Sequence, residues 1–192
     1  MAKIVLSLFA FLVLATAAWA DGELERRITP HDRQRLDGFE ATLKDALAEA
    51  RAGGRPEDLA VLDAALAGSP LPLASGFDPV GNWRCRTLKL GGGLPLVVYG
   101  WFRCRISDDG AGWLLEKLTG SQRTRGSFFT LSDTRLAYLG AGYVAGEAPR
   151  RYGDDTQENQ VAIAERRAEN RIILLFPAPH YESKLDVLVL ER

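Results

Sequence analysis

Two short strings of one pattern contain both cysteines of this chain. They are Trp83–Arg86 and Phe102–Arg105, each an aromatic residue followed by Arg, Cys and Arg. If the strings lie on paired antiparallel strands with the cysteines opposite each other, the two sulfurs share one face of the hairpin and four guanidiniums share the other. The cysteines could then form a disulfide. The guanidiniums would need acidic partners or a bound anion, because like charges directly opposite each other destabilise a sheet.

The predicted arginine face is a candidate site for a small anionic ligand, since guanidiniums bind carboxylate, phosphate and sulfate groups in bidentate fashion. In the expected register Arg84 lies opposite Arg105, and Arg86 lies opposite Arg103. Trp101 falls on the same face, where it could stack on a guanidinium. The alternative is that carboxylates of the N-terminal region neutralise this face. The carboxylates considered are Glu40, Asp45, Glu49, Asp58 and Asp63.

Other arrangements that could carry chemistry are weak in this sequence. The cysteines could be a redox pair or metal ligands, but there is no Cys-x-x-Cys, and His31 and His180 are the only histidines. His180 has no evident nucleophile to serve as a general base, and Gly-x-Ser-x-Gly does not occur. The acidic stretch 154–158 lacks the spacing of a calcium loop. We therefore expect a structural disulfide, no metal, no cofactor and no catalytic residue.

The elements that position the two strings are predicted to be mainly β. From Gly81 onward, short β-rich runs alternate with Gly, Asp and Ser turns. This texture predicts an eight-stranded antiparallel meander that closes into a small calycin-like barrel, because closure removes exposed edges. An open curved sheet covered by the helices is the alternative. The expected strands are 82–90, 96–106, 112–119, 126–132, 134–144, 160–168, 170–176 and 184–191.

A helical hairpin is predicted before the strands. Thr29 is the expected N-cap of the first helix and Pro30 its first residue. Gly53 and Gly54 end that helix, and Pro56 opens a second one that stops near Gly68. The expected organisation is a signal peptide (1–20), a helical hairpin with linker (21–76) and a β-barrel-like domain (77–192).

The N-terminus and the overall charge bear on location and partners. An apolar run, 4–18, follows Lys3 and precedes Ala18-Trp19-Ala20, which has the form of a signal-peptidase site. We expect cleavage near Ala20–Asp21, no stable membrane insertion afterwards, and a periplasmic or secreted protein. The formal net charge of −1 argues against nucleic-acid binding.

Four strings together resemble one family of exported bacterial proteins, domain of unknown function 4893 (DUF4893). The strings are Gly81–Thr87, Val98–Arg105, Glu116–Arg123 and Glu182–Val187. The resemblance implies a periplasmic or secreted setting and no established activity. Gly81-Asn82-Trp83 also resembles the Gly-x-Trp start of the first strand in lipocalins and other calycins.

These observations favour a non-enzymatic binding module for a small anionic or apolar ligand. The candidate ligand site comprises Arg84, Arg86, Arg103, Arg105 and Trp101. One alternative is a module for a protein partner, such as a periplasmic protease inhibitor or an envelope adaptor. An unrecognised hydrolase is the other, and it would need polar residues converging in a cleft.

Overall fold

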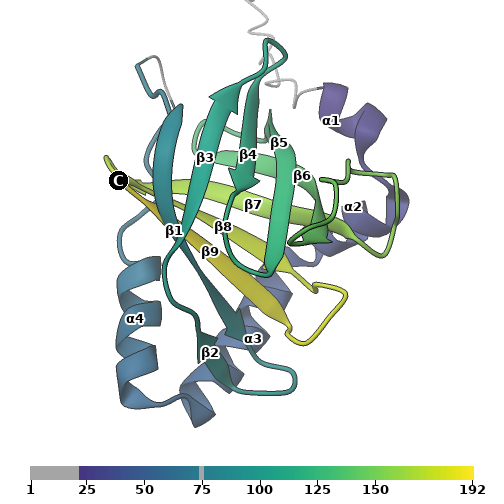
Figure 1. Cartoon of the computed structure of the whole chain (residues 1–192). Coiled ribbons are helices and arrows are strands. Elements are labelled where there is room, and N and C mark those ends of the chain that lie inside the picture. The colour runs from purple at the N-terminus through teal and green to yellow at the C-terminus, as the bar shows by residue number, and fades with distance from the viewer. Residues whose placement is uncertain (1–21, 74–75) are drawn as a thin grey trace, which may run out of the picture.

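The computed structural model describes residues 22–73 and 76–192 (Figure 1), so the expected signal peptide, residues 1–20, lies outside the described residues. The helices are α1 (Gly22–Arg27), α2 (Pro30–Asp37), α3 (Phe39–Gly53) and α4 (Pro56–Leu66). The strands are β1 (Gly81–Leu90), β2 (Leu96–Val98), β3 (Phe102–Asp108), β4 (Trp113–Lys117), β5 (Gln122–Thr130), β6 (Arg135–Val144), β7 (Asn159–Ala168), β8 (Arg171–Pro177) and β9 (Leu185–Glu191).

The strands form a closed antiparallel barrel, as the sequence predicts. From β3 to β9 each strand pairs with the next one along the chain, and β1 pairs with both β3 and β9. Eight strands therefore complete the ring, and β2 is an extra short strand on β1. The open-sheet alternative is wrong because the β1–β9 ladder, which runs from Arg84 to Leu90, closes the sheet.

The expected register of the cysteine hairpin is wrong by two residues. Arg84 pairs with Arg103 instead of Arg105, and Cys85 pairs with Phe102. Near the turn, Leu90 pairs with Leu96, which departs from the expected register by three residues. A one-residue irregularity at 99–101 restores one of them and splits the expected strand 96–106 into β2 and β3. If the β1–β2 register continued through β3, the two cysteines would lie on opposite faces of the hairpin. The irregularity adds one residue to the strand opposite β1, and this residue places both cysteines on the same face.

The two cysteines are joined in a disulfide, Cys85–Cys104, with their Cα atoms 5.9 Å apart. They are diagonal neighbours, because Cys104 lies directly opposite Trp83 and not opposite Cys85. Both are buried among apolar side chains of the barrel interior. The bridge therefore ties β1 to β3 from inside the barrel.

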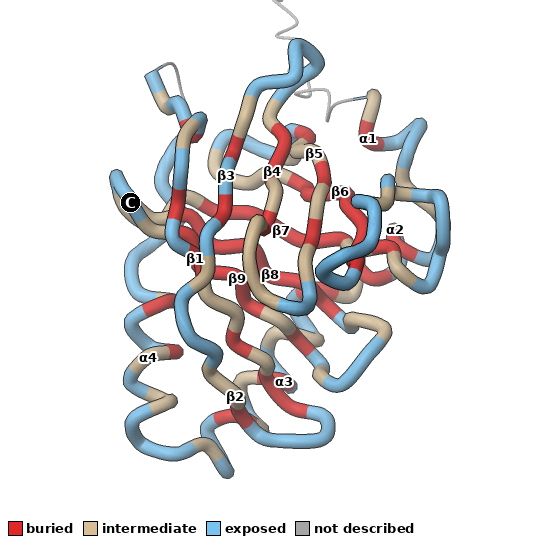
Figure 2. Tube along the Cα trace, in the orientation of Figure 1, coloured by how far each residue is buried: buried red, intermediate tan, exposed pale blue. Residues whose placement is uncertain are grey.

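Two apolar clusters explain why the strands differ in sequence. One consists of inward-facing strand residues, including Tyr138, Leu174 and Leu188. The other joins outward-facing strand residues such as Leu175 to helix residues such as Phe39. The strands beneath the helices, β7 to β9, are buried along most of their length (Figure 2). Because both faces are covered, β8 and β9 read as nearly continuous apolar runs, and β7 contains the apolar run Val161–Ala164. By contrast, β3 alternates between buried and exposed positions.

The helical region differs from the expected pair of helices. Thr29 is confirmed as an N-cap, since its side chain accepts a hydrogen bond from the Asp32 amide. The expected first helix is divided at Gly38 into α2 and α3, and α1 precedes it. Among the described residues, no helix has the length and apolar character needed to cross a membrane.

Candidate functional site

The predicted arginine face lies on the outside of the barrel, and neighbouring strands supply its acidic partners. Arg84 Nη2 lies 2.7 Å from a carboxylate oxygen of Glu191 on β9, and Arg105 Nη2 lies 2.8 Å from Glu116 on β4. None of the helix carboxylates considered for this role forms an ion pair with these four arginines within the described residues. Four of the five pair elsewhere, namely Glu40 with Arg135, Glu49 with Lys184, Asp58 with Arg55 and Asp63 with Arg51. Two of the four guanidiniums are therefore neutralised within the sheet.

Trp101 lies on the arginine face, as expected, and it stacks with two guanidiniums. The Cζ atoms of Arg84 and Arg86 lie 4.4 and 4.3 Å from the centre of its ring. Arg103 is exposed and makes no side-chain ion pair within 22–73 or 76–192. Arg86 also has no ion pair among the described residues, and its buried Nε has no hydrogen-bond acceptor there. Two of the four guanidiniums thus keep no acidic partner, and because the other two are paired, this face is a weaker anion site than the pattern suggests.

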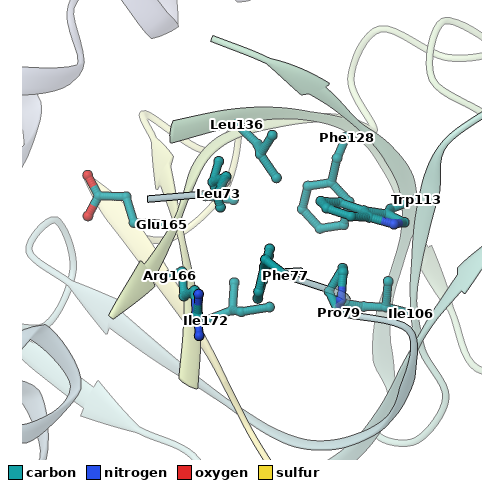
Figure 3. A pocket seen from close by; sticks show the side chains of 11 residues that line it. Leu73, Phe77, Pro79, Ile106, Trp113, Phe128, Leu136, Glu165, Arg166 and Ile172 are labelled. Carbon is teal, nitrogen blue, oxygen red and sulfur yellow. The ribbon is translucent and has the colours of Figure 1, made fainter. Parts of the chain in front are cut away.

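One end of the barrel interior is filled. Phe77, from the segment before β1, packs edge-to-face against Trp113 with 5.7 Å between the ring centres. Figure 3 shows Phe77 within a ring of side chains that includes Phe128, Leu136 and Ile172. The free space there is about 10 Å³, which is at most enough for one water molecule. Phe77 therefore acts as a plug, and this end offers no ligand cavity.

The opposite end of the barrel is polar and hollow, and we call it the barrel mouth. A cavity of about 330 Å³ opens there and adjoins a smaller hollow of about 70 Å³. Strand alternation carries polar side chains into this end, on the same inward faces that are apolar further along the barrel. The inward-facing polar residues are Thr87, Lys89, Lys117, Gln122, Thr124, Gln160 and Asp186.

Lys117 is the most unusual of these residues. Its position on β4 pairs with Cys104, so its side chain shares the inward face and is only 8% exposed. In the described part of the chain its ammonium has no hydrogen-bond acceptor or ion-pair partner, and it lies 4.3 Å from the centre of the Phe102 ring. Burial, followed by repulsion from Lys89, lowers the pKa of Lys117 to about 8.

The other charges of the mouth are partly paired. Lys89 forms an ion pair with Glu182. Asp186 lies directly opposite Lys89 on β9 and accepts a 2.5 Å hydrogen bond from Ser183 Oγ. Burial raises the pKa of Asp186 to about 6, although the Ser183 hydrogen bond and the nearby lysines oppose this shift. The mouth thus holds both cations and a carboxyl group that titrates near neutrality.

The rim of the mouth carries exposed apolar side chains. Val144 and Tyr181, which line the larger cavity, are 53% and 57% exposed. Tyr99, beside the hollow that also contains Lys117, is 38% exposed. A cationic interior with an apolar rim suits an anionic group carried on an apolar body.

A second polar cluster joins α2 to the barrel. The imidazoles of His31 and His180 stack with their centres 5.5 Å apart, and their nitrogens lie within 4.8 Å of an Asp32 oxygen. The sequence did not indicate that these histidines meet. The Asp32 carboxylate already accepts hydrogen bonds from Thr29, Tyr152, Asn159 and Arg35.

These four donors make Asp32 a structural centre that holds the helix and not an open ligand. Burial raises the pKa of Asp32, but hydrogen bonds from Tyr152, Thr29 and Arg35 outweigh it, and the net shift is downward. The adjacent Arg35 guanidinium also disfavours a metal cation at this position. We therefore assign the cluster to the attachment of α2 and not to a metal centre.

The sequence contains one signal for the barrel mouth, which is a charged residue on the otherwise apolar inward face of a strand. In β4 the inward positions are Trp113, Leu115 and Lys117, and in β9 they include Asp186 and Leu188. A charged residue that continues the apolar inward face of a strand, as Lys117 does at the end of β4, is a candidate for burial. Lys117 and Asp186 lie in the strings Glu116–Arg123 and Glu182–Val187, which carry the family resemblance.

Comparison with known proteins gives one family. The model of a family described as "Domain of unknown function (DUF4893)" matches residues 25–190. No curated protein and no solved structure matches the chain. The calycin resemblance therefore gains no support from these comparisons and stays a prediction.

Proposed function

Because the chain belongs to the DUF4893 family, for which no function is known, we propose a function from the geometry of the site: the barrel mouth binds a small organic anion. The sequence predicted a ligand site on the outer arginine face, whereas we propose that the ligand binds inside the barrel. The alternatives of a protein-partner module and a hydrolase have no comparable supporting observation.

Lys117 is the observation that carries this proposal. Burying an ammonium without a partner costs free energy that a folded protein normally avoids by pairing the charge. Among the described residues, no carboxylate forms an ion pair with Lys117, which lines the hollows of the mouth. The charge of Asp186 in the same hollow attracts it without direct contact, and this attraction does not offset burial. An anion bound beside Lys117 would supply the missing partner and would be held by a charge-assisted hydrogen bond.

The lining of the mouth supports a small ligand of mixed character. A cavity of about 330 Å³ lies within the usual size range for small-molecule sites. Arg123 and Lys89 line both it and the smaller hollow. The rim residues Val144 and Tyr181 would contact an apolar portion of the ligand. We therefore infer a carboxylate or phosphate group carried on a short hydrocarbon or aromatic body.

We also propose that the protein works outside the cytoplasm. A buried disulfide is compatible with an oxidising compartment, where such bonds persist. The apolar segment 4–18 is the sequence feature that would direct export. Fractionation of cells that express the full chain, with N-terminal sequencing of the product, would test this. Recovery of an uncleaved protein in the cytoplasm would contradict it.

The binding proposal is tested by calorimetric titration of the mature chain with acetate, propionate, phenylacetate and inorganic phosphate. We expect at least one anion to bind, with affinity that rises with the apolar body. The Lys117→Met variant should weaken binding by about ten- to hundredfold, since a charged hydrogen bond contributes roughly 1.5–3 kcal/mol. Lys44→Met, on the exposed surface of α3, is the matched control. Equal binding by both variants would exclude the barrel mouth.

A further inference from the structure

We propose that the Nζ atom of Lys117 forms a reversible imine with small oxo acids, which carry an aldehyde or ketone group beside a carboxylate, in the barrel mouth. This inference rests on the proposed anion-binding function of the same cavity and specifies its ligand class. It adds a covalent step to binding, without turnover.

The surroundings of Lys117 are those of an activated amine. Its Nζ atom contacts the face of Phe102, and Leu188 and Phe176 line the adjoining hollow. That hollow shares Asp186 and Gln160 with the larger cavity, so the space beside the amine adjoins the cavity in which a small molecule would bind. An amine desolvated among apolar groups and near other cations loses its proton more easily than an ordinary lysine does.

The other described lysines lack this combination. Lys89 and Lys184 each form an ion pair with a carboxylate, Glu182 and Glu49 respectively. The side-chain hydrogen bond from Lys184 to Glu49 raises the pKa of Lys184. For Lys89, burial lowers the pKa, but the hydrogen bond to Glu182 and the charge of Asp186 outweigh it. Ion pairing therefore keeps these two amines protonated, whereas the pKa of Lys117 falls to about 8.

The reaction balances without an oxidant or a reductant. The unprotonated amine of Lys117 attacks the carbonyl carbon, a C–N bond forms, and the carbonyl π electrons move to oxygen. The nitrogen loses its first proton and the oxygen takes up a proton, which gives a neutral carbinolamine. The nitrogen of this carbinolamine then loses its second proton, and the hydroxyl group takes up a proton and leaves as water. The product is an imine, and water reverses the sequence.

Asp186 is placed to move these protons. Its carboxyl group lines the same hollow as Lys117, and its pKa of about 6 allows it to donate and accept protons near neutrality. Lys89 and Arg123 also face Lys117, and they are placed to hold the carboxylate of the oxo acid. The ionisable groups that face the amine are thus Lys89, Arg123 and Asp186.

Reductive trapping tests the proposal on the mature wild-type chain. Pyruvate and sodium cyanoborohydride are added at pH 7, and the modified lysine is identified by peptide mass spectrometry. At this pH an amine with a pKa of about 8 has an unprotonated fraction about 200-fold larger than that of an ordinary lysine. We expect the buried Lys117 to be labelled at least about tenfold faster than the exposed Lys44, because lower basicity reduces nucleophilicity only in part.

The pH dependence and a variant make the test specific. Labelling of Lys117 should rise with pH to a midpoint near 8, and Lys117→Arg should abolish the adduct while keeping a positive charge in the mouth. Labelling that follows exposure, with Lys44 modified first, would overturn the proposal. The mapping uses the wild-type protein, so it remains decisive even if the variant does not fold.

Propionate separates this inference from the proposed function, because it has the carboxylate and lacks the carbonyl. Calorimetric binding of propionate without a pyruvate adduct at Lys117 would overturn imine formation and leave anion binding intact. Absence of binding by every anion tested would overturn the proposed function itself. Competition of propionate against trapping at Lys117 would support both.

Discussion

At the scale of single residues, Lys117 is a better candidate for contact with an anion than the four arginines of the repeated pattern. The four arginines of the repeated pattern lie outside the barrel, where strand carboxylates pair with Arg84 and Arg105. Lys117 lies inside, where no carboxylate within the described ranges pairs with it. A group without an internal partner is the better candidate for a ligand contact, because the ligand then removes an existing electrostatic penalty.

The free-energy cost of burying the charged Lys117 predicts how the free energy of unfolding depends on pH. The pKa of Lys117 is about 8 in the folded protein and about 10.4 in an unfolded chain. The folded state therefore disfavours the charged form, and the penalty is fully present below pH 8 and disappears as the pH rises toward 10.4. We expect Lys117→Met to be more stable than the wild type at pH 7, by up to about 3 kcal/mol.

Denaturant titration of both proteins from pH 7 to pH 10 measures this difference. The stability gap should narrow as the pH rises, because the wild-type lysine loses its charge. Lys44→Met should show no such narrowing. A gap of constant size would mean that Lys117 is as well solvated as an exposed lysine and would count against both proposals.

At the scale of secondary-structure elements, the bulge between β2 and β3 determines which side chains of the two Arg-Cys-Arg strings share a face of the sheet. The extra residue at 99–101 brings Cys85 and Cys104 to one face, and it leaves Trp101 to stack on the arginines of β1. Without it the cysteines would lie on opposite faces of the hairpin. The disulfide therefore depends on the bulge.

Removing the disulfide should destabilise the protein without changing its topology. The bond joins residues 19 positions apart, and closing a loop of this size is worth about 3 kcal/mol in the chain-entropy account. We expect the double variant Cys85→Ala, Cys104→Ala to lose about that free energy of unfolding. Reduction of the wild type should lower its melting temperature similarly, while the double variant should not respond to reductant.

At the scale of the whole molecule, the barrel has two different ends. Phe77 and Trp113 fill one end, and polar side chains line a cavity at the other. The helices cover the outer face of β7 to β9, so those strands carry apolar residues on both faces (Figure 2). The barrel interior is therefore filled at one end and open at the other.

The division into two ends predicts that they can be perturbed separately. Phe77→Ala should cost roughly 2–4 kcal/mol of stability, since the residue is only partly buried and its removal leaves a space at the plugged end. Anion affinity at the barrel mouth should stay unchanged, as measured by the calorimetric titration described above. A matched loss of affinity would show that the two ends are coupled through the barrel interior.

The sequence by itself determined the helix-then-strand order, the closed antiparallel barrel, the Cys85–Cys104 pairing and the family. These features depend on local signals: Thr29 as an N-cap, alternating apolar residues, glycine turns and a repeated string. Local patterns suffice because hydrogen-bonded pairing between consecutive strands needs little information beyond turns and alternation.

Only the tertiary structure decided the register of the cysteine hairpin and the place of the candidate site. A one-residue bulge leaves no clear mark in sequence, yet it changes which residues face each other. The barrel mouth is assembled from Lys117 on β4, Asp186 on β9 and side chains of other strands. Their meeting depends on barrel closure, which sets how distant strands face one another across the interior.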